Sequence, residues 1–177
     1  ALGGVICGPK ELIKQIYHFR EINGVTLHPT AAYLLLRGMK TLELRIRQQN
    51  KSALKIAQYL STHPSIGHVY YPGLSSHKGH DIAKKQMRGF GGVLSFEFKE
   101  NSLDAVKRFI PHLRYAHAAA NLGAVETIVG PPATTSHVEC TAEERVAMGI
   151  SESLIRYSVG IENTEDLIAD LDQALSQ

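Results

Sequence analysis

A long run of good helix formers, residues 30–64, constrains the fold most. It is rich in Ala, Leu, Lys, Arg and Gln, and only Gly38 interrupts it before Pro64. These residue types lose little conformational freedom in a helix, so the run predicts one long or gently broken helix. We expect this helix to connect two parts of the chain, with a hinge between about Lys40 and Ser61.

Shorter elements precede and follow this run. Residues 3–8 are an apolar stretch that predicts a buried strand, and residues 9–22 have helical apolar spacing that ends at Asn23-Gly24. Beyond the run, strands are predicted at 68–73, 91–98, 114–119 and 153–159. Helices are predicted at 80–87, 102–110, 141–149 and 163–175. This alternation indicates an α/β chain, with the end of a larger domain at 1–45 and a small α/β domain at 46–177.

Arg156 is placed unusually, in the middle of the apolar strand-like segment LIRYSV. The two-residue period of a strand puts Leu154, Arg156 and Ser158 on one face of that segment. A guanidinium is costly to bury alone, and its planar fork fits a carboxylate. The partner is therefore either a protein acid, Glu126 or Glu162, or the carboxylate of a bound substrate.

Residues 121–137, NLGAVETIVGPPATTSH, combine a glycine turn, an acid at Glu126 and a hydroxyl cluster. If Glu126 is buried, this stretch forms a shaped polar pocket wall that includes Thr134, Thr135 and Ser136. The alternative is an ordinary capped loop.

Composition argues against several classes of partner. The net charge is only +2 and no basic block is present, so neither nucleic acid nor a membrane is indicated. Cys7 and Cys140 match no disulfide framework, which fits a reducing, cytoplasmic compartment. The histidine pairs have no acid or cysteine at a metal-binding spacing, so no metal site is predicted. A small molecule is the expected ligand.

Three longer stretches go beyond local spacing. They read LHPTAAYLLLRGMKTLELRIRQQN, HVYYPGLSSHKGHDIAKKQMRGFGGVLSFEF and LIRYSVGIENTEDLIADLDQAL. Together they resemble the Cys/Met-metabolism, or transsulfuration, family of pyridoxal-phosphate enzymes over essentially the whole chain. The middle stretch resembles the cystathionine γ-synthases of this family most.

The resemblance implies a pyridoxal-phosphate-dependent transferase of fold type I, similar to aspartate aminotransferase. Residues 1–45 would be the tail of the cofactor-binding large domain. The implied activity is γ-replacement on an activated homoserine with cysteine, in methionine biosynthesis and cysteine metabolism. A C–S lyase of the same family is the alternative. The resemblance also implies a homotetramer built of catalytic dimers.

Site residues follow from the same resemblance. Arg156 matches the family arginine that holds the α-carboxylate of the substrate. The stretch NLGAVETI matches the family motif S-L-G-G-x-E-S-L, which assigns Asn121, Leu122 and Glu126 to substrate binding. Asn121 replaces a serine and Ala124 replaces a glycine, which bears on substrate choice. Arg20-Glu21 matches residues at the active-site entrance that a neighbouring subunit contributes.

The cofactor lysine has no match in this sequence. In the family, the Schiff-base lysine lies in an S-x-T-K segment just before a stretch that matches ALGGVICGP, at the start of this chain. We therefore expect a longer gene product, in which pyridoxal 5'-phosphate is bound mainly by a preceding part. This chain alone would then be inactive. The non-enzymatic alternative is a fragment or a structural homologue without the lysine.

Overall fold

The structure, a computed structural model, describes residues 2–177 and has two compact units. One extends to Glu43 and the other runs from Leu44 to Gln177. The sequence placed the domain boundary between residues 45 and 46. The identification of the two units with a large-domain tail and a small domain stays a prediction.

The first unit contains helices α1 (Lys10–Ile22) and α2 (Pro29–Met39). The helix predicted at 9–22 is confirmed, and Gly24, with φ 65°, follows its cap at Asn23. Residues 3–8 are not a strand, so that prediction is wrong. A strand needs a hydrogen-bonding neighbour, and no strand is present in residues 2–43 to provide one. Neither helix has a buried residue.

The long helical run is two helices rather than one, because α2 ends at Met39 and α3 spans Leu42–Thr62. Gly38, a poor helix former, lies in the last turn of α2. Lys40 then donates its amide to the Arg37 carbonyl, a bond that spans three residues instead of four and tightens the helix end. The break therefore lies at the N-terminal limit of the expected hinge. No helix in residues 2–177 is long and apolar enough to cross a membrane.

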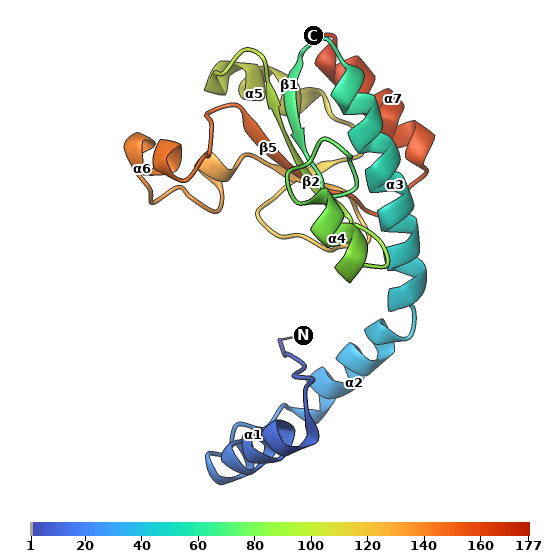
Figure 1. The fold of residues 1–177 in the computed structure, drawn as a ribbon, viewed down its shortest axis with the longest axis vertical. Helices are drawn as coiled ribbons and strands as arrows, with labels where there is room; N and C mark the ends of the chain where they lie inside the picture. The colour runs from blue at the N-terminus through green and yellow to red at the C-terminus, as the bar shows by residue number, and fades with distance from the viewer. Residues whose placement is uncertain (1) are drawn as a thin grey trace. The chain divides into compact units, whose positions relative to one another are not determined.

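The second unit is built on a mixed five-stranded sheet with the order β1-β2-β5-β4-β3 (Figure 1). All neighbours are antiparallel except β3 and β4. The strands are β1 (Ile66–Tyr70), β2 (Val93–Phe98), β3 (His117–Ala118), β4 (Ile128–Gly130) and β5 (Leu154–Ser158). The strand predicted at 114–119 is thus only two residues long, and β4 was not predicted.

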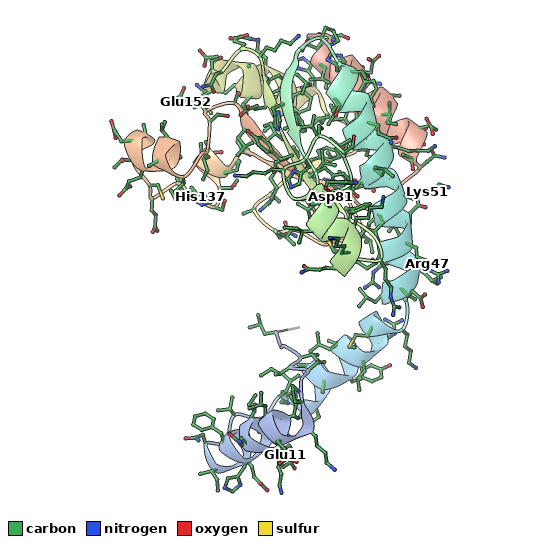
Figure 2. The ribbon with its side chains drawn as sticks, viewed as in Figure 1. Glu11, Arg47, Lys51, Asp81, His137 and Glu152 are labelled. Atoms are coloured by element: carbon green, nitrogen blue, oxygen red, sulfur yellow. The ribbon has the colours of Figure 1, made fainter. Side chains whose placement is uncertain are left out.

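The helices predicted after the long run are confirmed in kind, each within one or two residues of its predicted ends. They are α4 (His80–Gln86), α5 (Leu103–Phe109), α6 (Ala142–Ala147) and α7 (Thr164–Leu175). Two short 3₁₀ helices, η1 (Ile110–His112) and η2 (Pro132–Thr134), complete the unit. Charged side chains such as Lys51 and Glu152 are exposed and point away from the core (Figure 2).

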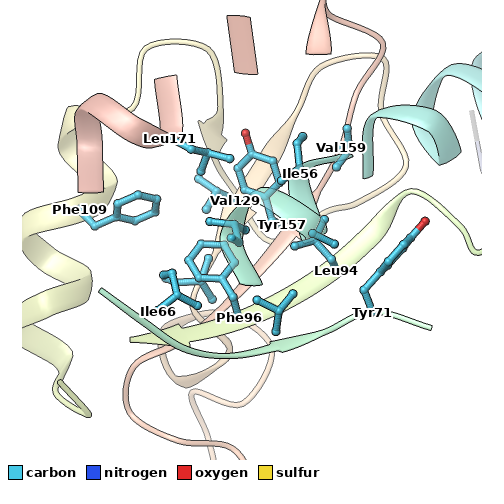
Figure 3. Close-up of a cluster of buried hydrophobic side chains, with 14 of the residues drawn as sticks. Ile56, Ile66, Tyr71, Leu94, Phe96, Phe109, Val129, Tyr157, Val159 and Leu171 are labelled. Carbon is cyan, nitrogen blue, oxygen red and sulfur yellow. The ribbon is translucent and has the colours of Figure 1, made fainter. Parts of the chain in front are cut away.

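The hydrophobic core lies on one face of the sheet, under α3, α5 and α7. Leu94 and Phe96 of β2 and Tyr157 of β5 are almost wholly buried there (Figure 3). Ile56 of α3 and Leu171 of α7 pack against them. The opposite face of β5 carries Leu154 and Arg156, which are only half-buried. The alternation predicted for β5 is therefore confirmed.

Tyr157 has a buried hydroxyl that makes no hydrogen bond to the described residues. Burial, followed by the charges of Asp170 and Glu162, raises its pKa above the usual range. In the unfolded chain a tyrosine loses its proton near pH 10, at about its ordinary pKa. Folding therefore opposes ionisation of Tyr157, so its contribution to stability is full below about pH 10 and decreases above it.

We expect Tyr157→Phe to leave the free energy of unfolding unchanged near neutral pH, or to raise it by up to about 1 kcal/mol, because no hydrogen bond is lost. It should also weaken the fall of stability above about pH 10. Urea unfolding at neutral and alkaline pH measures both effects, with Tyr115→Phe, an exposed tyrosine, as the control. A clear loss of stability at neutral pH would mean that the hydroxyl is satisfied.

Gly160, just after β5, is closely surrounded by backbone. Its amide donates to the Thr127 hydroxyl over 2.9 Å. A Cβ at this position would overlap the Val125 carbonyl oxygen and one carboxylate oxygen of Glu162, and would lie 2.6 Å from the Glu126 carbonyl carbon. Only glycine allows residues 125–127 to approach the end of β5 so closely.

We therefore expect Gly160→Ala to lower the free energy of unfolding by about 2 to 3 kcal/mol through overpacking. Gly79→Ala is the matched control, because the nearest atom to its Cβ would be 3.8 Å away. Urea unfolding compares the two variants. Equal effects would show that the approach of the two backbone segments is not tight.

Candidate functional site

Arg156 lies in the middle of the sheet, where its neighbours leave room for its side chain. Its ladder partners are Ser95 on β2 and Gly130 on β4. Ser95 is short and Gly130 has no side chain at all. A Cβ on Gly130 would lie 2.9 Å from the Ala119 carbonyl oxygen, so glycine also allows the next segment to approach.

The guanidinium of Arg156 is held by backbone carbonyls. Its Nη2 donates to the carbonyl oxygens of Asn121, over 2.8 Å, and Ala120, over 2.9 Å. A third, longer contact of 3.4 Å joins it to Ala119. Its Nε is buried and has no hydrogen-bond partner among residues 2–177. The arginine is thus oriented by neutral acceptors, and its buried Nε donor is unused.

Neither acid proposed from the sequence pairs with Arg156. Glu162 instead accepts from the Thr127 amide over 2.7 Å and from the Thr127 hydroxyl over 2.9 Å. Glu126 is exposed, so the expectation of a buried acid there is wrong. The buried position belongs to the adjacent Thr127, whose amide and hydroxyl already bond to Glu162, so no buried partner in this segment is left for Glu126. An unpaired carboxylate is costly to bury. The ion-pair explanation of Arg156 is therefore not supported.

The acceptors of the Arg156 side chain all lie in one irregular segment, residues 119–127, which we call the arginine loop. Gly123, with φ 76°, provides its turn and donates its amide to the Ser158 hydroxyl over 3.0 Å. Ile161 donates its amide to the Val125 carbonyl over 2.9 Å. Asn121, Leu122 and Glu126 are exposed on this loop. Of these three, only Asn121 contacts Arg156, through its backbone.

The hydroxyl cluster of Thr134, Thr135 and Ser136 lies beside an apolar cavity whose lining does not include Arg156. Thr134 and Thr135 line a cavity of about 390 Å³ whose walls are otherwise mostly apolar, from α5, η1, β3 and β4. The Thr135 hydroxyl donates to the Pro131 carbonyl, and Ser136 pairs with the ring of His137. The wall exists, but it is apolar rather than polar as expected.

Arg20 and Glu21 lie on α1, in the first unit. Both are exposed, and the Arg20 guanidinium carbon lies 4.8 Å from the centre of the Tyr17 ring. Their role at an active-site entrance stays a prediction.

Sequence reasoning missed the residues that hold the arginine loop. Gln49 of α3 donates its side-chain amide to the Ala124 carbonyl over 3.0 Å. Thr127 and Glu162 join the end of the loop to the segment after β5. Gln49 falls within a polar Gln-Gln-Asn triplet of the helical run, which gives no local signal of a distant partner.

The chain is similar to known proteins over almost its whole length. A family model described as "Cys/Met metabolism PLP-dependent enzyme" matches residues 1–176. Cystathionine γ-synthase 1, chloroplastic, of Arabidopsis thaliana is 46% identical over 98% of this chain and 31% of its own length. An L-methionine γ-lyase of Fusobacterium nucleatum is 44% identical over 99% of this chain and 45% of its own length.

Solved structures of the same family have a similar fold. Cystathionine γ-synthase from Xanthomonas oryzae pv. oryzae in complex with cystathionine has a TM-score of 0.87 at 42% identity, over 95% of this chain and 43% of that chain. The expected α/β class and fold type I are confirmed. This chain spans less than half the length of these relatives. It belongs to the Cys/Met-metabolism family of pyridoxal-phosphate-dependent enzymes.

Proposed function

We propose that the full-length protein is a pyridoxal-phosphate-dependent transsulfuration enzyme in which Arg156 binds the α-carboxylate of the amino-acid substrate. The observation that carries this proposal is the state of the guanidinium. It is half-buried, it is oriented by neutral carbonyls, and its buried Nε has no partner among residues 2–177. A buried donor without a partner is costly, and a carboxylate that accepts from it removes that cost.

The arginine loop provides further contacts for the same substrate. Asn121 is exposed, and its backbone carbonyl accepts a hydrogen bond from the Arg156 guanidinium. Its side chain therefore lies close to the guanidinium. Its side-chain amide can donate to the substrate carboxylate. Leu122 and Glu126, exposed on the same loop, would face the remainder of the substrate.

The described residues would bind the amino-acid substrate rather than the cofactor. Bound pyridoxal phosphate withdraws electron density from the α-carbon of the amino acid, which makes the adjoining bonds labile. Arg156 fixes the carboxylate, and so determines which bond at the α-carbon is oriented for reaction. We propose that the cofactor itself is bound mainly by another part of the longer protein, which also provides the lysine.

The first unit supports the proposal of a longer protein. Its two helices bury none of their own residues, yet they carry a broad set of exposed apolar side chains. An exposed apolar surface of this extent marks an interface. The residues concerned are Leu12, Ile16, Tyr17, Phe19, Ile22, Tyr33, Leu34, Leu36 and Met39.

The favoured reaction is γ-replacement on an activated homoserine with cysteine, because cystathionine γ-synthases are among the relatives and solved structures that match this chain. A C–S lyase is the second candidate, since methionine γ-lyases and cystathionine β-lyases match at 42 to 44% identity. Arg156 would hold the carboxylate in either case. The choice depends on the rest of the pocket.

The assembly and the compartment belong to the same proposal. We expect a homotetramer of catalytic dimers, with Arg20 and Glu21 at the active-site entrance of a neighbouring subunit. Cysteine usage favours a cytoplasmic location. Two similar plant enzymes are named as chloroplastic.

Substitution of Arg156 tests the proposed role. In the full-length enzyme, we expect Arg156→Ala to lower kcat/KM for the amino-acid substrate by about 10- to 100-fold, the value of a hydrogen-bonded charged contact. Arg156→Lys should restore part of this loss, because it keeps the charge without the planar fork. The control is Arg108→Ala, which removes an exposed arginine paired with Glu100. An unchanged kcat/KM in Arg156→Ala would contradict the proposal.

A substrate panel separates the candidate reactions. The synthase predicts turnover of O-succinylhomoserine or O-phosphohomoserine only when cysteine is present. The lyase predicts release of a thiol from cystathionine or methionine alone. Absence of turnover with every substrate, together with absence of the cofactor's visible absorbance band in the full-length protein, would favour the structural homologue.

A further inference from the structure

The side chain of Gln49 joins the arginine loop to the long helix α3. Only 5% of Gln49 is exposed, which is unusual for a glutamine on a helix surface. Its Nε2 donates to the Ala124 carbonyl over 3.0 Å, across 75 residues of sequence. A buried side-chain amide needs a hydrogen-bond partner, and here the partner is the Ala124 carbonyl. Removal of the amide would leave that carbonyl without this donor.

Gln49 packs closely against the backbone that precedes β2. Gly92, just before β2, has no side chain, and a Cβ there would lie 2.8 Å from the Gln49 Cβ. The Gly92 carbonyl accepts from the Val159 amide over 2.8 Å, so this backbone segment is itself tied to the end of β5. Gln49 is therefore held between the sheet and the loop, and its reach determines where Ala124 lies.

The loop in turn determines how Arg156 is oriented. Ala124 is only three residues from Asn121, whose carbonyl receives the shortest of the arginine's hydrogen bonds, 2.8 Å. The hydrogen bonds of Gly123 and Val125 lead to Ser158 and Ile161, at or after the end of β5. Thr127 and Ala119 also bond to the backbone of β3 and β4, at His117 and Val129. Gln49 is the tie from α3. It therefore sets the distance between the loop and the helix layer.

We infer that Gln49 is a positioning residue for substrate binding: by holding the Ala124 carbonyl, it keeps residues 119–121 where they orient Arg156 toward a carboxylate. This inference rests on the proposed function of Arg156. It assigns to α3, which has no direct contact with the guanidinium, a role in the affinity for substrate.

The test is a double-mutant cycle in the full-length enzyme. Gln49→Leu keeps the volume and removes the donor. Alone, it should raise KM for the amino-acid substrate by about three- to tenfold, the value of one hydrogen bond, with less than about a twofold change in kcat. In an Arg156→Lys background the same substitution should change KM by less than about twofold, because residues that act through one contact are not additive.

Ser52→Ala is the matched control. Ser52 lies one turn further along α3, is fully buried, and loses a side-chain hydrogen bond of 2.8 Å to Thr164 without contacting the loop. Both variants should lower stability, but only Gln49→Leu should raise KM. Hydrogen exchange provides a readout that does not depend on turnover: amides in residues 119–127 should exchange faster in Gln49→Leu and not in Ser52→Ala.

The outcomes are distinguishable. An unchanged KM and unchanged exchange of the loop in Gln49→Leu would overturn the inference, as would an equal rise of KM in both arginine backgrounds. If Arg156→Ala leaves kcat/KM for the amino acid unchanged, the proposed function fails and the inference fails with it. A rise of KM in Ser52→Ala equal to that in Gln49→Leu would show that the effect is general destabilisation.

Discussion

The pairing of β5 between β2 and β4 is the constraint on which both the core and the candidate site depend. Alternate residues of a strand face opposite sides of the sheet, so the register that buries Ile155 and Tyr157 also places Arg156 on the other face. A slip of one residue would drive the guanidinium into the core and expose the tyrosine. The burial of the apolar face thus selects the position of the charged group.

Neither Glu126 nor Glu162 forms an ion pair with the Arg156 guanidinium, which bonds to backbone carbonyls instead. Glu162, which follows β5, accepts hydrogen bonds from Thr127, and Glu126 is exposed. Neutral carbonyls fix the direction of the guanidinium without neutralising it. An intramolecular ion pair would have to be broken before a substrate could bind, so this arrangement suits a binding role better.

Local sequence patterns were sufficient for the elements with a regular apolar period. The α7 helix and β5 are examples, because each buries one continuous face. They were insufficient where long-range contacts decide. The three residues of β4 form a strand only because β5 lies beside them, and residues 3–8 do not, because no strand in residues 2–43 pairs with them. The break after Met39 depends on a single short turn.

For the site, Arg156 was visible as a charge in an apolar strand. Gln49 was not, because its partner is distant in sequence and is a backbone carbonyl.

The central claim is that the α-carboxylate of an amino acid binds to Arg156. The most direct measurement is a crystal structure of the full-length protein with a bound amino-acid substrate or unreactive analogue. We expect a carboxylate oxygen at about 2.7 to 2.9 Å from the Arg156 guanidinium, the usual length of a charge-assisted hydrogen bond, with Nε as one of the donors. A carboxylate bound elsewhere, with Arg156 still bonded only to the carbonyls of residues 119–121, would contradict it.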